Sequence, residues 1–369
     1  MDAVAAFLNP KLEEEIYMNI PPFLPKYQEG KVWKLMKPLY GLKQASRYWY
    51  LDISNFLDSI KLKPSKLDPC LFISTDQNWE CYVHIHVDDL TILSNNVDQF
   101  KKLIKARFEM EVLGPATYIL GIEIWQDRTT KTLTLSQMTY VKNLLDDYQM
   151  MDCKPVLKPM IPNSRLQEAS DQEKQAFKEL KINYRQAIGR ISYLQVATRG
   201  DLSFTTSQLS QFLENPGIKH WLAFKHLLRY LKGTISLALT LGRNSSSLQT
   251  FSDADYANCK DTRKLITGYM KMIGSSCINW KSKKQSTIST SSCEAEYKAQ
   301  FEGGKDLIWI ALLLQDLNIN VSYSLQLNGY NQGSIALAKN PQVNEQTKHF
   351  DTIFHWIQEI IMKKKINIT

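Results

Sequence analysis

The chain has 369 residues, enough for two or three domains that each have their own hydrophobic core. Its 44% hydrophobic and 22% charged residues are ordinary for a globular protein. It has no signal peptide and no run of 18 apolar residues, so we expect no membrane partner. The six cysteines are scattered without a Cys-x-x-Cys pair, which fits free thiols and argues against a disulfide framework or a zinc site. A net charge of +8 favours a polyanionic partner, although this is weak evidence alone.

The first 150 residues contain expected helices and strands. Apolar residues at helical spacing predict a helix over residues 42–60, and an amphipathic pattern predicts another over 97–108. Two β-rich runs within residues 81–93 flank an Asp-Asp pair, which predicts a hairpin with the aspartates at its tip. The other expectations here are a short buried strand at 2–8, a helical turn at 11–18, strands at 117–124 and 131–136, and a helix from 136 or 137 to 148.

The remainder of the chain begins with a linker candidate. Residues 151–182 contain three prolines and a polar, charged stretch, whereas 184–232 have a helical pattern. A second α/β segment starts near residue 236. Its expected strands are 248–253, 266–273, 276–281 and 322–328, and its expected helices are 293–317, 332–339 and 347–363.

Three aspartates of the first 150 residues form the first candidate site. Asp88 and Asp89 supply a tight pair at the hairpin tip, and Asp2 on an adjacent strand supplies a third carboxylate. Carboxylates that converge from separate strands can hold two Mg²⁺ ions, which activate a hydroxyl and neutralise a triphosphate. Adjacent aspartates are also common on solvated turns. The apolar strands on both sides favour the metal site, because they fix the tip in space.

The blocks around these aspartates resemble, in order, the reverse transcriptase palm of copia-type retrotransposons. The matching blocks are Met1-Asp2 with Ala6-Phe7-Leu8-Asn9, Leu12 to Met18, Leu39-Tyr40-Gly41-Leu42-Lys43-Gln44-Ala45, Val87-Asp88-Asp89, Tyr118-x-Leu120-Gly121-Ile122-Glu123-Ile124, and Leu133-x-Leu135-Ser136-Gln137. The resemblance covers essentially the whole chain. It implies that Asp2, Asp88 and Asp89 are the metal ligands of an RNA-directed DNA polymerase.

The same resemblance assigns nucleic-acid contacts to the predicted helix over residues 42–60. It implies that Lys43 and Gln44 lie beside the incoming nucleotide and the template, with Arg47 close by. A solvated helix face is the alternative for Lys43 and Arg47. His86 stands where the family has Tyr, and the chain begins at Met1-Asp2, so we expect the fingers region to be missing and the polymerase part to be truncated.

The last third of the chain resembles a ribonuclease H domain, in which carboxylates hold two metal ions that cleave the RNA of an RNA–DNA hybrid. The segments Phe251 to Ala257, Ser291 to Tyr297 and Thr347 to His355 imply that Asp253, Glu296 and Asp351 are ligands. Ser291 and Glu294 have capping-box spacing, so Glu294 is expected to be structural. Tyr330 stands where the family has another Asp, and this substitution should weaken metal binding severely.

Basic residues outside the carboxylate sites are candidate phosphate contacts. They are Lys225, Arg229 and Lys232 in the helical segment, and Lys281, Lys283 and Lys284 near the end of a predicted strand. Solvated faces or loops explain them about equally well. Arg199 and Asp201 are expected to form a structural ion pair, and His220 to be a helix-start or core histidine. Gly303-Gly304 inside a predicted helix suggests relaxed constraint, because glycine costs about 1 kcal/mol there relative to alanine.

Together these features predict an α+β and α/β protein. By resemblance, residues 1–150 are a truncated palm without fingers, 151–183 a linker, 184–235 a helical thumb or connection, and 236–369 a ribonuclease H-like domain. The implied cofactor is Mg²⁺, two ions per site, with Mn²⁺ as a substitute. The implied partners are RNA, DNA, their hybrid and deoxynucleoside triphosphates, in a cytoplasmic virus-like particle or the nucleus. The competing hypothesis is a degenerate or repurposed remnant that binds nucleic acid with little or no catalysis.

Overall fold

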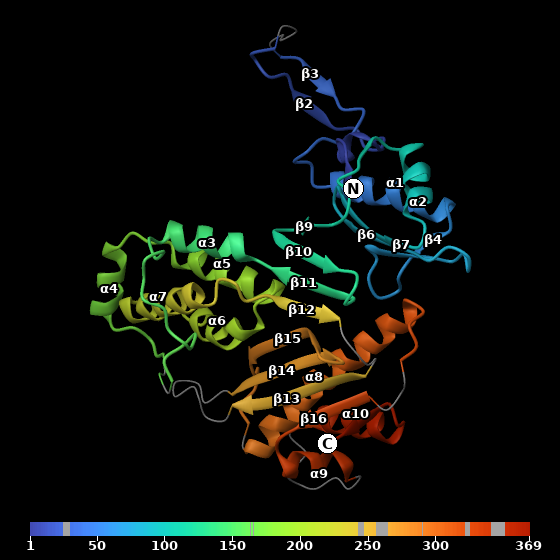
Figure 1. The fold of residues 1–369 in the computed structure, drawn as a ribbon. Coiled ribbons are helices and arrows are strands. Elements are labelled where there is room, and N and C mark those ends of the chain that lie inside the picture. Colours follow the sequence, from blue (N-terminus) through green and yellow to red (C-terminus); the bar gives the residue numbers. More distant parts are fainter. Residues whose placement is uncertain are drawn as a thin grey trace. The chain divides into compact units, whose positions relative to one another are not determined.

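The structure is a computed structural model that describes residues 1–24, 30–162, 164, 166–242, 247–255, 265–289, 291–321, 325–340 and 351–369, with side chains in the last range described from 355 onward. The chain divides into two compact units (Figure 1). The first comprises Met1–Ala116 and Leu312–Ile319, and the second comprises Thr117–Ala311 and Asn320–Thr369. The boundary after residue 116 differs from the boundary near 150 that the sequence suggested.

The first unit contains an antiparallel sheet of six strands in the order β4-β5-β6-β7-β1-β8. The strands are β4 Leu62–Pro64, β5 Leu71–Ser74, β6 Cys81–His86, β7 Asp89–Ser94, β1 Asp2–Ala3 and β8 Met110–Glu111. Helices α1 (Ala45–Ser59) and α2 (Val97–Lys105) contribute Trp49, Ile53 and Phe100 to one core with the sheet. Alternate residues of β6 are buried, as expected for a strand with one face on a core. The predicted helices and the predicted hairpin are confirmed.

Two expectations near the N-terminus are wrong. The strand expected at 2–8 contains only β1, because Ala5 has a left-handed backbone (φ 49°) and a 3₁₀ turn follows at Ala6–Leu8. No helical turn forms at 11–18. The chain instead enters strand β2 (Tyr17–Asn19), which pairs with β3 (Val32–Lys34).

The second unit begins with a four-stranded sheet in the order β12-β11-β10-β9. The strand expected at 117–124 is divided into β9 (Tyr118–Ile119) and β10 (Ile122–Asp127) by a turn at Leu120-Gly121, where both residues have positive φ. The strand expected at 131–136 is confirmed as β11 (Thr132–Ser136). It pairs with β12 (Leu239–Gly242), a strand that was not expected.

A helical bundle of α3 to α7 follows this sheet (Figure 1). The helices are α3 Met138–Asp147, α4 Asp171–Glu179, α5 Tyr184–Ala197, α6 Ser203–Ser210 and α7 Ile218–Gly233. Helix α4 lies inside the segment expected to be a linker. A complete capping box of Ser170 and Glu173 starts it, and Phe177 packs with Trp221 of α7 in the bundle core. That segment therefore contains a packed helix.

A five-stranded sheet completes the second unit, in the order β15-β14-β13-β16-β17. Strands β13 (Leu248–Asp255), β14 (Ile266–Ile273) and β15 (Ser276–Lys284) are antiparallel, whereas β16 (Leu325–Gly329) and β17 (Ile366–Ile368) run parallel to β13. The helices are α8 Ser292–Asp316, α9 Gln332–Lys339 and α10 Asp351–Met362. They confirm the predicted helices and strands, apart from 322–324 and 347–350, which lie outside the described residues. Among the described residues, no helix is long and apolar enough to cross a bilayer.

Gly303 of α8 packs directly against strand β13. A Cβ atom there would be 3.1 Å from Thr250 Cγ2 and 3.6 Å from Ser252 Cβ of β13. At Gly304 the nearest atoms would be at 3.4 Å or more, an ordinary contact distance. Close packing of α8 on β13 therefore accounts for Gly303, which the sequence alone suggested was a sign of relaxed constraint.

Candidate active site

The turn between β6 and β7 presents the Asp-Asp pair. His86 pairs with Asp89 across the hairpin, so Val87 and Asp88 form its two-residue turn. Val87 has φ 58°, a strained conformation for a β-branched residue. The buried Trp49 of α1 donates a hydrogen bond from Nε1 to the Val87 carbonyl oxygen at 2.5 Å. A core side chain thus holds a strained turn, the kind of strain that collects at functional sites.

Strand β1 places Asp2 beside this turn. Asp2 pairs with Asp89 on one side and with Glu111 of β8 on the other, and the Ala3 amide donates to the Asp88 carbonyl oxygen at 2.9 Å. The pKa of Asp2 is raised, first by burial and then by the negative charges of Asp88, Asp89 and Glu111. The structure therefore brings the three expected aspartates together and adds Glu111. Glu111 could not be predicted from the sequence, because a two-residue strand has no periodicity.

The side chains of this group suit a hard divalent cation in their chemistry. Carboxylate oxygens are the ligands that Mg²⁺ prefers, and their mutual repulsion is relieved when a cation is bound. Among the described residues, however, no three or more His, Cys, Asp or Glu side chains are arranged closely enough to hold a metal ion. The backbone gathers the carboxylates, but their side chains do not converge on one point.

The second carboxylate group lies where α8 meets β13. Asp253 is exposed near the end of β13, whereas Glu296, in the first turns of α8, is only 8% exposed. Burial, and after it the charge of the neighbouring Asp253 and a hydrogen bond with it, raise the pKa of Glu296 to about 7. Among the described residues, Glu296 Oε2 has no hydrogen-bond partner. The pair thus places two acids side by side in a partly desolvated site.

Tyr330 and Asp351 complete the list of residues expected here. Strands β13 and β16 are parallel, and Ser252 lies opposite Gly329. The next residues, Asp253 and Tyr330, are therefore neighbours at the carboxyl ends of these two strands. Tyr330 is 73% exposed and lines one cavity together with Asp253. Asp351 is the first residue of α10, but its side chain lies outside the described part of the chain.

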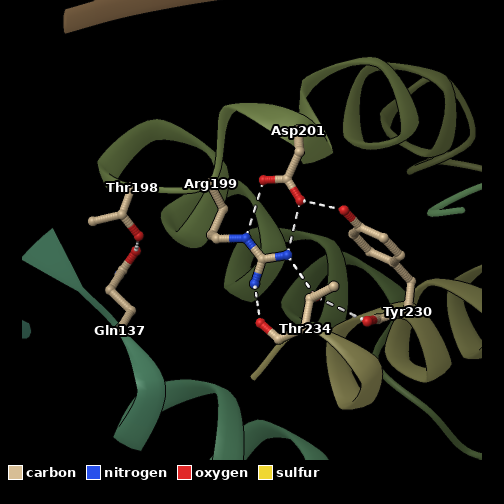
Figure 2. A network of polar contacts seen from close by, with 6 residues as sticks. All are labelled: Gln137, Thr198, Arg199, Asp201, Tyr230 and Thr234. Atoms are coloured by element: carbon tan, nitrogen blue, oxygen red, sulfur yellow. Dashed lines mark hydrogen bonds and ion pairs between the residues drawn. The ribbon is translucent and has the colours of Figure 1, made fainter. Parts of the chain in front are cut away.

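Arg199 and Asp201 form the structural ion pair that was predicted (Figure 2). The Arg199 guanidinium is 2% exposed and donates to both Asp201 oxygens, from Nε at 3.0 Å and from Nη2 at 2.8 Å. It also donates to the carbonyl and hydroxyl oxygens of Thr234 at the end of α7, and the Tyr230 hydroxyl donates to Asp201 at 2.8 Å. This network joins the end of α5 to the end of α7.

Two further structural expectations are confirmed. His220 is buried near the start of α7, where its Nδ1 accepts a hydrogen bond from the Gly217 amide and its ring stacks on Phe212. The Ser291 hydroxyl accepts from the Glu294 amide at 3.1 Å, and the Glu294 carboxylate pairs with Lys298 at 2.7 Å.

The expected nucleic-acid contacts lie on three elements. The start of α1 carries Gln44 and the exposed cations Lys43 and Arg47. Helix α7 carries Lys225, which is exposed, and Lys232, which is partly exposed. Strand β15 carries the exposed Lys281 and Lys283. Arg229 and Lys284 make side-chain hydrogen bonds to other described residues. Arg229 donates from Nε to the Lys154 carbonyl oxygen at 2.8 Å, and Lys284 donates to Gln211 Oε1 at 2.8 Å.

Comparison with known proteins identifies the class of the first part of the chain. Residues 1–162 match the family described as reverse transcriptase (RNA-dependent DNA polymerase). The whole chain is 36% identical to the retrovirus-related Pol polyprotein from transposon TNT 1-94 of Nicotiana tabacum and covers 28% of it. It is 34% identical over its whole length to the corresponding polyprotein from transposon RE1 of Arabidopsis thaliana and covers 25% of it.

The chain belongs to the retrovirus-related Pol polyproteins of copia-type transposons, as its sequence blocks predicted. It spans about a quarter of the length of these relatives. A solved structure of a foamy viral protease-reverse transcriptase in complex with dsDNA aligns with the whole chain at 12% identity and a TM-score of 0.22. The alignment covers 66% of the viral chain.

Proposed function

We propose that the first 150 residues carry the palm site of an RNA-directed DNA polymerase, with Asp2, Asp88 and Asp89 as its metal ligands. The observation that carries the proposal is the close placement of these negatively charged residues. Strand β1, the turn after β6 and the start of β7 bring the backbones of these three residues side by side, and the pKa of Asp2 is raised partly by the charges of Asp88 and Asp89. Repulsion among these acids and strain in the turn destabilise the folded chain unless a cation binds there.

The hairpin and the start of α1 have separate roles in such a site. Bound Mg²⁺ would activate the primer hydroxyl and neutralise the triphosphate. Trp49 holds the Val87 carbonyl and so fixes the direction in which Asp88 leaves the turn. Lys43 and Arg47, exposed at the start of α1, supply positive charge for a phosphate backbone.

Primer extension on an RNA template tests the polymerase proposal. With Mg²⁺ and deoxynucleoside triphosphates, Asp89→Asn should lower incorporation about 10²- to 10³-fold, the loss typical when one preorganised electrostatic contact is removed. The matched control is Asp98→Asn on α2, whose carboxylate is paired with Lys101. Equal rates for both variants, or no incorporation by the unmodified chain, would contradict the proposal.

We infer that the five-stranded sheet with α8 carries a ribonuclease H-like site, in which Asp253, Glu296 and Asp351 hold the cations. The inference is supported by the partly desolvated Asp253–Glu296 pair, whose charge a divalent cation would offset. Tyr330 occupies the position beside Asp253 where a further carboxylate would complete the ligand set. Tyr330→Asp should therefore raise Mg²⁺- or Mn²⁺-dependent cleavage of an RNA–DNA hybrid, and no gain would contradict this account.

Binding to an RNA–DNA hybrid should depend on salt concentration whether or not the chain cleaves the hybrid. Each Lys–phosphate contact releases a counterion, so affinity should fall steeply between about 50 and 200 mM salt. Lys225→Ala and Lys232→Ala on α7 should each lower the salt dependence by about one contact. Binding that does not change with salt would remove these lysines as phosphate contacts.

A further inference from the structure

A buried glutamine lies one helical turn after Glu296 on α8. Gln300 is completely buried, and because residues four apart lie on the same face of a helix, it shares the face that carries Glu296. A buried amide lowers stability unless its donors and acceptor are paired. Among the described residues, however, Gln300 Oε1 has no hydrogen-bond partner. Favourable burial alone therefore does not account for a glutamine at this position.

The amide nitrogen of Gln300 holds the turn between β16 and α9, which consists of residues 330–331. Gln300 Nε2 donates to Ser334 Oγ at 2.7 Å, and this hydroxyl donates in turn to the Asn331 carbonyl oxygen at 2.8 Å. The Ser334 amide donates to Asn331 Oδ1 at 2.9 Å, so that Asn331 caps α9. These hydrogen bonds join α8 to the residue that directly follows Tyr330.

The same amide packs against the end of β16. Gly329 has no side chain, and a Cβ atom there would be 2.6 Å from Gln300 Nε2. Gly329 lies opposite Ser252 of β13, so the residues that follow this pair are Tyr330 and Asp253. Gln300 therefore contacts the chain on both sides of Tyr330, at Gly329 before it and at Ser334 after it.

The first turn of α9 also lies against the first turn of α8. A Cβ atom at Gly333 would be 3.7 Å from Sγ of Cys293, which precedes Glu296 by three residues. Gln300 follows Glu296 by four residues. Helix α8 thus holds the turn between β16 and α9 from both sides of Glu296.

We propose that Gln300 is a positioning residue, which fixes the place of residue 330 relative to Glu296 and Asp253. The proposal rests on the ribonuclease H-like function inferred above, in which these two acids hold cations. Metal ligands must be held within about 0.5 Å of their productive geometry, and hydrogen bonds from groups outside the ligand set do much of this. An unpaired buried acceptor destabilises the fold, so the contribution of Gln300 is a defined arrangement of α8, β13 and β16.

Mn²⁺ binding by the Tyr330→Asp chain tests the proposal, measured as the binding that Glu296→Gln removes. Adding Gln300→Met, which keeps the length of the side chain and loses its hydrogen bond, should lower Mn²⁺ affinity about 10- to 100-fold. The melting temperature should change by no more than about 4 °C, because the substitution also removes an unpaired acceptor. Ser334→Ala removes the same hydrogen bond from the α9 side and should also lower the affinity, which covers the case in which Gln300→Met fails to fold.

Gln137 of the helical bundle provides the matched control. It is also buried, its Oε1 accepts a hydrogen bond from Thr198 Oγ1 at 2.8 Å (Figure 2), and its Nε2 has no partner among the described residues. Gln137→Met in the Tyr330→Asp chain should leave Mn²⁺ affinity unchanged. Equal losses of affinity in the two methionine variants would overturn the proposal, because a general loss of stability would then explain both.

Hydrogen exchange recorded without metal ions separates this inference from the function on which it rests. The amides of Ser334 and Ile335, which donate to Asn331, should exchange about tenfold faster in Gln300→Met than in the unmodified chain. Faster exchange with no Mn²⁺ bound by any variant would reject the ribonuclease H-like function and retain Gln300 as the residue that holds the turn. Mn²⁺ binding that Gln300→Met leaves unchanged would reject the positioning role and retain the function. Unchanged exchange would overturn the inference whatever the metal result.

Discussion

Asp201 and Glu296 are two acids of the second compact unit whose charges are treated in opposite ways. Asp201 accepts two hydrogen bonds from the buried Arg199 guanidinium and a third from the Tyr230 hydroxyl. Glu296 faces another carboxylate, Asp253, and its Oε2 has no hydrogen-bond partner among the described residues. The first acid has its countercharge within the protein. No cation among the described residues offsets the second, and burial together with the charge of Asp253 raises its pKa to about 7.

The difference separates a structural acid from a candidate functional one. A buried charge that is paired and fully hydrogen-bonded fixes the positions of the elements that carry it. A desolvated acid beside a second acid destabilises the fold unless a proton or a cation binds. The Asp2 group in the first unit is of the second kind, although it is more exposed and its backbone, not helix packing, brings the acids together.

Replacing Arg199 would convert the structural acid into an uncompensated one, with the largest effect that we expect. Arg199→Met leaves Asp201 without its cation and should lower the free energy of unfolding by about 3 to 5 kcal/mol. The control is Arg190→Met, which breaks a more exposed pair with Asp147 and should cost less than about 1 kcal/mol. Urea unfolding followed by circular dichroism measures both. Equal losses would mean that the Figure 2 network contributes no more than a surface ion pair.

Glu296→Gln tests the other member of the comparison, the acid that has no paired cation among the described residues. Because the folded-state pKa of Glu296 is about 7 and its ordinary value is 4.5, the folded chain binds the proton more tightly than the unfolded chain. Ionisation of Glu296 therefore lowers the free energy of unfolding. This loss is absent below pH 4.5, grows between pH 4.5 and 7, and is complete above about pH 7. Glu296→Gln should therefore stabilise the chain by about 1 to 3 kcal/mol at pH 8 and leave it unchanged at pH 4.

Unfolding curves at the two pH values, recorded without divalent cations, measure this effect. Asp2→Asn should show the same sign with a smaller gain, because Asp2 is less buried. A stabilisation by Glu296→Gln that is the same at pH 4 and pH 8 would exclude ionisation as its cause.

The glycine pair of α8 tests how the Glu296 helix is held against β13. Gly304→Ala should stabilise the chain by up to about 1 kcal/mol, because alanine favours a helix and its Cβ finds ordinary contact distances. Gly303→Ala should gain less, since its Cβ would lie 3.1 Å from Thr250 Cγ2. Thermal melting of the two variants compares them. Equal gains would show that the close approach at Gly303 carries no constraint.

The elements with strong local periodicity could be predicted from the sequence. The hairpin around Asp88 and the helix α1 have apolar residues at the spacing of their own secondary structure. Strand β12 could not be found this way, because its partner β11 lies more than 100 residues earlier in the chain. Helix α4 is mostly polar, and its one signal in the sequence, the capping box of Ser170 and Glu173, follows the prolines that indicate a linker.

The candidate sites show the same limit. The acids at positions 2, 88, 89, 253 and 296 could be proposed because motif blocks surround them, and the structure brings them together in two groups. Glu111 joins the first group only through the register of β1 and β8, which no local pattern specifies. The hydrogen bond from Gln300 to Ser334 depends on how α8 packs against the turn between β16 and α9, and it too has no sequence signal.

Titration of Mn²⁺ binding by electron paramagnetic resonance tests the central claim most directly, because it detects cations bound at the acids independently of catalysis. The account predicts two separable classes of binding site in the unmodified chain. Asp89→Asn should abolish one class, Glu296→Gln the other, and the double variant both. Undiminished Mn²⁺ binding by the double variant would contradict the claim that these two carboxylate groups hold the cations.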